Sequence, residues 1–152
     1  MEDLKFRVKA HSENSTKTIV KARNFELVVD EPTDLGGTDH GANPVEYLLA
    51  AYAGCLNVMA HICAKELGFE LKGIKIDIVG SLNPARLFGQ SFEERAGYKE
   101  IIASLIPDCN TDAETLSKWK DAVLDRCPVG DNLKNATKVE VKINSYEKAL
   151  QV

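Results

Sequence analysis

The stretch NPVEYLLAAYAGCLNVMAHICAKELG, residues 43–68, constrains the fold of this chain more than any other. It opens with the start signals of a helix: Asn43 at the N-cap, Pro44 at the first helical position and Glu46 where a capping glutamate belongs. The segment then carries no charge until its last turn, and Gly68 suits the C-terminal cap. A helix that is apolar on all sides is covered on all sides, so we expect a long buried helix.

A single subunit of 152 residues has difficulty covering such a helix on every side. We expect a homodimer in which the helix packs against its copy. The alternative is that the sheets of one subunit suffice. Cys55 lies in the middle of the helix, among alanines and a glycine that let neighbouring elements approach its thiol closely.

The composition is that of an ordinary globular protein, with 44% hydrophobic and 28% charged residues, and the length predicts a single domain over residues 1–152. The net charge is −4 and basic residues are scattered among acidic ones, so no nucleic-acid partner is expected. The N-terminus shows no targeting signal, and the apolar run within 43–68 looks too short for a membrane span and contains Asn57 and His61. We expect a cytoplasmic protein with no membrane partner.

The four cysteines, at positions 55, 63, 109 and 127, have neither the CxxC spacing of a zinc site nor the density of a disulfide framework. We expect no metal and no cofactor. Cys63 is expected to be a small buried apolar residue, and Cys109 a neutral residue in a turn. Cys127 should face the core, and it comes near Cys55 if the second helix packs across the first. Any one of these cysteines is more often structural than catalytic.

Alternating apolar residues predict strands at 4–10, 17–22, 25–29, 73–80, 98–106 and 137–143. Segments rich in Gly, Asp and Pro, or in mixed charge, predict loops at 30–42 and 81–97. The order is three strands, a long helix, two strands, a helix and one strand. It predicts an α+β fold, with sheet strands on either side of the two helices.

The second helix begins at a predicted capping box from Thr111 to Glu114 and ends at Pro128. Its apolar face is formed by residues three and four apart: Leu116, Trp119, Val123 and Cys127. The residues after Pro128 have room for one more helical turn.

A reactive Cys55 needs a cation and a hydrogen-bonding group from outside its helix. The candidate cations are Arg7, Lys17, Arg23, Arg86 and Arg126. His61 follows Cys55 by six residues and faces another side of the helix, so it is a poor general base. His40, in the glycine-rich loop, could reach the site. No Ser-His-Asp or Cys-His-Asn arrangement suggests a hydrolase.

Two segments, GGTDHGANPVEYLLAAYAGCLNV at 36–58 and RCPVGDNLKNATKVEV at 126–141, resemble the OsmC/Ohr family of thiol-dependent peroxidases. The resemblance extends over nearly the whole chain. It implies an OsmC-like fold, an intertwined homodimer whose long central helices lie between two sheets built from both subunits. It also implies reduction of organic hydroperoxides and, less efficiently, of hydrogen peroxide.

Carried over by position, the resemblance makes Cys55 the peroxidatic cysteine and Cys127 the resolving cysteine, which together form an intramolecular disulfide. A reducing dithiol, from a lipoylated protein or a small thiol, would restore both cysteines. The site would lie at the subunit interface.

The chain departs from the family pattern at two positions. Val45 occupies the position of the glutamate that orients the activating arginine, and Glu46 follows one residue later, about 100° around the helix. Lys17 falls where the activating arginine is expected, and Arg23 is the nearest arginine. These departures favour an alternative: an OsmC-like redox-sensing or small-molecule-binding protein with little peroxidase activity.

Overall fold

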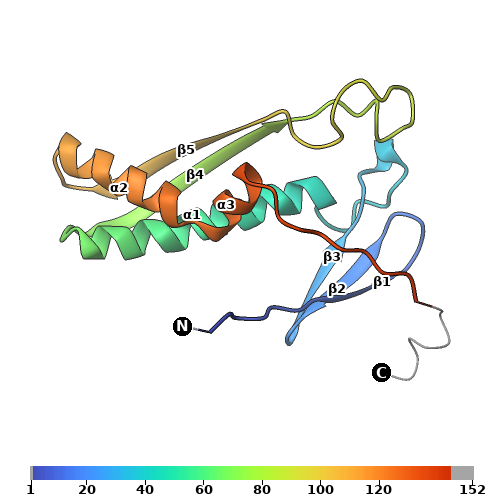
Figure 1. Cartoon of the computed structure of the whole chain (residues 1–152), viewed down its shortest axis with the longest axis horizontal. Coiled ribbons are helices and arrows are strands. Elements are labelled where there is room, and N and C mark those ends of the chain that lie inside the picture. Colours follow the sequence, from blue (N-terminus) through green and yellow to red (C-terminus); the bar gives the residue numbers. More distant parts are fainter. Residues whose placement is uncertain (1, 145–152) are drawn as a thin grey trace.

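The computed structural model describes residues 2–144, so residues 1 and 145–152 of the predicted domain lie outside the described part. The fold has two small sheets and three helices, which is the α+β class predicted (Figure 1). In chain order, the elements are β1 (Lys9–Ser12), β2 (Thr18–Ala22), β3 (Phe25–Val29), the 3-10 turn η1 (Thr33–Leu35), α1 (Pro44–Glu66), β4 (Leu71–Ser81), β5 (Glu100–Cys109), α2 (Ala113–Arg126) and α3 (Pro128–Lys134).

Helix α1 begins and ends where the sequence predicts. The Asn43 side chain accepts a hydrogen bond from the Glu46 amide at 2.9 Å, and the Asn43 amide donates to Glu46 Oε2 at 2.8 Å. This reciprocal capping box, with Pro44 at the first helical position, satisfies amides that the helix itself leaves unpaired. At the other end, Gly68 adopts the left-handed conformation at φ 79° and ends the helix.

Only one face of α1 is buried within the subunit. That face packs against β4, α2 and α3, and its buried residues are Tyr52, Leu56, Met59, Ala60, Cys63 and Ala64. On the opposite side, Val58 is 56% exposed and Ile62 is 41% exposed. Within residues 2–144, the sheets of one subunit therefore do not cover the helix, and the homodimer stays a prediction.

Helix α1 does not support the prediction that its apolar run is too short for a membrane span. It has 23 residues and a mean hydropathy of 1.5 in its most apolar window, which is enough to cross a membrane by length and composition alone. The core helix of a globular protein passes the same test, and α1 packs along the β4–β5 sheet.

The two sheets lie in different places relative to α1. The long antiparallel β4–β5 pair runs along the helix, from Leu71 opposite Cys109 to Ser81 opposite Glu100 (Figure 1). The antiparallel β1–β2–β3 sheet lies apart from it, near the start of α1 (Figure 1). Isoleucines on one face of β4 pack against the buried face of α1.

The predicted strand at 4–10 is shifted in the structure. Strand β1 spans only Lys9–Ser12, and its first residue pairs with Lys21 near the end of β2. Residues 4–8 run past the end of that hairpin, where the described part of the chain offers no strand to pair with. Phe6 is therefore 90% exposed.

The predicted strand at 137–143 is absent from the described residues. Its apolar side chains, Val139, Val141 and Ile143, are at least 80% exposed. Apolar and charged residues do alternate along the segment. Within residues 2–144, however, it contacts neither a partner strand nor an apolar surface.

Two predicted boundaries change around α2. Its N-cap is Asp112, which accepts from the Thr115 amide at 2.9 Å, rather than Thr111. Cys109 is the last residue of β5 and is not in a turn. Pro128 ends α2 as predicted and is also the first residue of α3, where a proline needs no amide partner.

The core forms where α2 packs on α1. Trp119 of α2 is 2% exposed, and its Nε1–H donates to the Ala60 carbonyl of α1 at 2.8 Å. The Phe69 ring meets the indole edge-on, with ring centroids 6.4 Å apart. Leu56 and Val123 are fully buried beside them. The single tryptophan thus joins α2 to the middle of α1.

We expect Trp119→Phe to lower the free energy of unfolding by about 2–3 kcal/mol, because the variant loses a buried hydrogen bond and part of a buried ring. Urea unfolding followed by far-UV circular dichroism, at one protein concentration, measures the change. Lys118→Gln, on the exposed side of α2, is the control and should leave stability nearly unchanged. Equal stability of Trp119→Phe and wild type would contradict this account of the core.

Candidate active site

The site is centred on two cysteines from different helices. Cys55 lies in the middle of α1, and Cys127 lies between the end of α2 and the start of α3. Their Sγ atoms are 2.6 Å apart, although both cysteines are free. Only a small movement separates this distance from a disulfide bond of about 2.05 Å. The structure therefore brings together the two predicted redox residues.

The two thiols differ in their surroundings. Cys127 is 1% exposed, whereas Cys55 is partly exposed. Burial raises the pKa of the Cys127 thiol, as does its hydrogen bond with Cys55, while the amide of Gly130 lowers it. That amide donates to Cys127 Sγ at 3.3 Å, because Cys127 is the N-cap of α3. The N–H group can stabilise a Cys127 thiolate once one forms.

Tyr52 and Gly130 line the pair on the Cys127 side. A Cβ atom at position 130 would lie 3.2 Å from Tyr52 Cε2 and 3.4 Å from Cys127 Sγ, so only glycine fits without displacement. Burial raises the pKa of Tyr52, and the two nearby cysteines raise it further. Its phenol is therefore a neutral hydrogen-bond donor beside the thiols.

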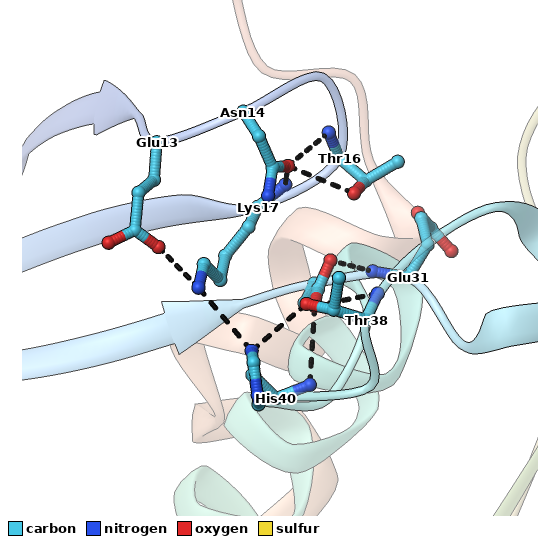
Figure 2. A network of polar contacts seen from close by, with 8 residues as sticks. Glu13, Asn14, Thr16, Lys17, Glu31, Thr38 and His40 are labelled. Carbon is cyan, nitrogen blue, oxygen red and sulfur yellow. Dashed lines mark hydrogen bonds and ion pairs between the residues drawn. The ribbon is translucent and has the colours of Figure 1, made fainter.

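Lys17, the predicted replacement for the activating arginine, lies in a different polar network, before β2. Its ammonium group contacts the Glu13 carboxylate and lies 3.3 Å from His40 Nδ1 (Figure 2). Its side chain is 18% exposed. None of its hydrogen bonds or ion pairs among the described residues involves Cys55.

Arg23 and Glu46 also lie away from the cysteine pair. Arg23 is in the turn between β2 and β3, with its guanidinium group 5.1 Å from the centre of the Phe25 ring. Both recorded hydrogen bonds of Glu46 belong to the capping box of α1. No observation tests the predicted catalytic roles of these two residues or of Lys17.

Arg126 places a guanidinium group beside a different thiol. Its Nη1 atom lies 3.7 Å from Cys63 Sγ, and the group forms a two-point ion pair with Glu66. Cys63 is buried, as expected, and burial raises its pKa. Arg86 instead donates to two carbonyl groups of its own loop, those of Phe92 and Glu94.

The loop at 30–42 is organised by Asp30, which the sequence analysis did not single out. Asp30 is fully buried and accepts hydrogen bonds from the amides of Glu31, Thr38 and His40 at 2.9–3.2 Å, and from the Thr38 hydroxyl at 2.6 Å. These bonds, the Thr38 hydroxyl foremost, hold the pKa of Asp30 far below its usual range. Figure 2 shows three of these loop residues, Glu31, Thr38 and His40, close together. The carboxylate thereby fixes the chain that leads into α1.

The loop packs so tightly that its glycines are required. A Cβ atom at Gly37 would lie 1.7 Å from the Glu31 carbonyl oxygen. This contact explains Gly37, the second glycine of the run GGTDHG, through close backbone packing.

Two cavities adjoin the core. The larger, about 410 Å³, is mainly apolar and lies between α2 and β5, with Leu56 and Trp119 in its wall. The smaller, about 260 Å³, shares Tyr52 and Gly130 with the cysteine pair. Within residues 2–144, no group of three or more His, Cys, Asp or Glu side chains could hold a metal ion.

Comparison with known proteins places this arrangement in a family. A family model described as "OsmC-like protein" matches residues 37–142. The structure resembles the OsmC-like protein of Mycoplasma pneumoniae with a TM-score of 0.75 and 19% identity, covering 88% of this chain and 89% of that one. No curated protein sequence matches.

Two further solved structures share the fold. An organic hydroperoxide resistance protein of Legionella pneumophila matches with a TM-score of 0.66 and 17% identity, covering 88% of this chain and 92% of that one. OhrB of Bacillus subtilis, also an organic hydroperoxide resistance protein, matches with a TM-score of 0.56 and 17% identity, covering 86% and 91%. The chain belongs to the OsmC-like family.

The residues around the cysteines that the sequence analysis missed had detectable signals. Tyr52 precedes Cys55 by three residues, so the two lie close together on the helix surface. The run CPVG places a cysteine at an N-cap, a proline at the first helical position and Gly130 where its amide meets the cap. Asp30, with donors up to ten residues further along, had no local signal beyond the turn-rich composition of its loop.

We expect Asp30→Asn to destabilise the protein at pH 7 and to reduce its sensitivity to acid. The folded-state pKa of Asp30 lies below its unfolded value of about 3.9, so the folded state binds fewer protons. The resulting stability is present above that value and is lost as pH falls through the folded pKa. Urea midpoints at pH 7, 5 and 3 measure both effects. Asp34→Asn, exposed in the same loop, is the control, and a wild-type midpoint for Asp30→Asn at pH 7 would contradict the role of Asp30.

Proposed function

We propose that the protein is a cytoplasmic, homodimeric thiol peroxidase that reduces organic hydroperoxides and, less efficiently, hydrogen peroxide. The approach of Cys55 and Cys127 to 2.6 Å carries the proposal. Family membership and a fold shared with organic hydroperoxide resistance proteins support a role of this type.

The partly exposed Cys55 is the natural nucleophile of the pair. Its thiolate attacks one oxygen of the hydroperoxide, the O–O bond breaks, and the alcohol leaves with a proton, so that Cys55 becomes a sulfenic acid. The sulfur of Cys127 then attacks Cys55 Sγ, water leaves, and a disulfide forms. Two thiol groups of a lipoylated protein or a small thiol reduce this disulfide and are themselves oxidised.

A redox-sensing or small-molecule-binding protein with little peroxidase activity is the second candidate. The positions of Lys17, Arg23 and Glu46 favour it, because each has other partners in the subunit and none contacts Cys55. The apolar cavity of about 410 Å³ beside Leu56 offers such a protein room for a ligand.

Stopped-flow consumption of cumene hydroperoxide with dithiothreitol distinguishes the two candidates. We expect Cys55→Ser to lower the rate to background, because the nucleophile is lost. Cys127→Ser should retain one fast oxidation of Cys55 and leave a sulfenic acid that dimedone traps. Cys109→Ser, at the far end of the β4–β5 pair, should behave like wild type. Equal background rates for wild type and Cys55→Ser would reject the peroxidase.

The proposed homodimer follows from the apolar surface that one subunit leaves exposed. The outer face of α1 exposes Val58 and Ile62, and the segments 4–8 and 137–143 expose side chains in strand-like alternation. A second copy can cover the helix with its own α1 and supply partner strands to both segments.

We expect wild-type protein to sediment at twice the 16.7 kDa mass of one chain, and Val58→Glu to shift the equilibrium towards monomer, because a charge would be buried at the interface. Analytical ultracentrifugation measures both masses. Lys118→Glu, a charge reversal on the exposed side of α2, serves as the control. A monomeric wild type at micromolar concentration would show that the dimer proposal is wrong.

A further inference from the structure

The cavity of about 260 Å³ adjoins residues that lie against Cys127. Its wall includes Tyr52 and Gly130, and both residues lie against Cys127. The opposite wall comes from the end of the 81–97 loop and the start of β5, together with the last turn of α3. A molecule in this cavity therefore lies against two residues that border Cys127.

The cavity carries a local positive charge on a chain whose net charge is −4. Arg95, Lys99 and Lys134 line it, against a single acidic residue, Glu100. Lys99 is neutralised by Glu94, which lies 3.1 Å from its ammonium group.

Among residues 2–144, the other two cations have no acidic partner. Arg95 forms no hydrogen bond or ion pair within residues 2–144, and its guanidinium group lies over the backbone of Gly97. Lys134 makes only a long contact, 3.4 Å, with the Leu124 carbonyl. The cavity therefore contains two cations that no carboxylate neutralises among the described residues. This charge favours an anionic ligand in the cavity.

We propose that this cavity binds the carboxylate of the small molecule that reacts at the cysteine pair, through Arg95 and Lys134, and that this molecule is the thiol that reduces the disulfide. The proposal rests on the redox role of Cys55 and Cys127 proposed above. A guanidinium group suits a carboxylate because it donates two parallel hydrogen bonds, and Tyr52 adds a neutral donor.

The local geometry indicates how such a thiol reacts. Its thiolate attacks Cys55 Sγ, the more exposed sulfur, the S–S bond breaks, and Cys127 leaves as a thiolate stabilised by the Gly130 amide. A second thiolate then attacks the mixed disulfide at the sulfur of the first thiol. Cys55 is released, both cysteines take up protons, and one small-molecule disulfide is produced.

The test compares three thiols of similar size: 3-mercaptopropionate, 2-mercaptoethanol and cysteamine, which are anionic, neutral and cationic. The Cys55–Cys127 disulfide is first formed with diamide, so that the experiment does not depend on peroxidase activity. Its reduction is followed by mass spectrometry, with rate constants expressed per thiolate. We expect the anionic thiol to react about five- to tenfold faster than the neutral one and the cationic thiol to be slowest.

Arg95→Gln combined with Lys134→Gln should abolish that preference while leaving the rate with 2-mercaptoethanol unchanged. Lys72→Gln, an exposed lysine at the other end of the β4–β5 pair, is the matched control and should keep the preference. Should the double variant not fold, the salt dependence of the wild-type rates provides the same test. The advantage of 3-mercaptopropionate should then disappear at 0.5 M added salt, at which charge interactions are screened.

A second arm identifies the source of the carboxylate. Reduced protein is oxidised with a fatty-acid hydroperoxide and with its methyl ester, and the two rates are compared in wild type and the double variant. If the reducing thiols show a carboxylate preference that depends on Arg95 and Lys134, the proposal is supported. If only the hydroperoxides show such a preference, the cavity binds the peroxide instead. Equal rates within both arms would overturn it. If no hydroperoxide oxidises Cys55, the proposed peroxidase fails while the thiol arm still tests the cavity.

Discussion

The packing of α2 across the middle of α1 is the interaction on which the rest of the site depends. A cysteine within one helix cannot meet a second cysteine eight residues along the same helix, because about 12 Å of helix axis separates them. A partner for Cys55 must come from another element, and the Trp119 indole, bonded to the Ala60 carbonyl, fixes where that element crosses. Cys127 then reaches Cys55 directly after the last turn of α2, and Pro128 turns the chain into α3, whose Gly130 amide meets the Cys127 sulfur.

The α+β class, the limits of α1 and the approach of Cys127 to Cys55 could be predicted from sequence, because each follows from local caps or from a stripe with a 3.6-residue period. The segments 4–8 and 137–143 could not be placed from the sequence. Their alternating apolar and polar residues indicate that one face of a strand becomes buried, but not whether the same chain or a second copy buries it. Lys17 could be named as a cation, but its partners could not, since Glu13 and His40 come from a hairpin turn and a distant loop. Asp30 was missed for the same reason: its donors are gathered by the loop fold.

Helix α1 contains two thiols in contrasting settings, and the contrast shows which property matters for reactivity. Cys63 has a guanidinium group 3.7 Å away yet is fully buried, so its pKa is raised and a peroxide cannot reach it. Cys55 has no such cation among the described residues, but it is partly exposed and lies against a second thiol. Partial exposure and a neighbouring thiol therefore distinguish Cys55 from Cys63 within the subunit. A second subunit of the proposed dimer can supply a positive group to Cys55, because the outer face of α1 is exposed.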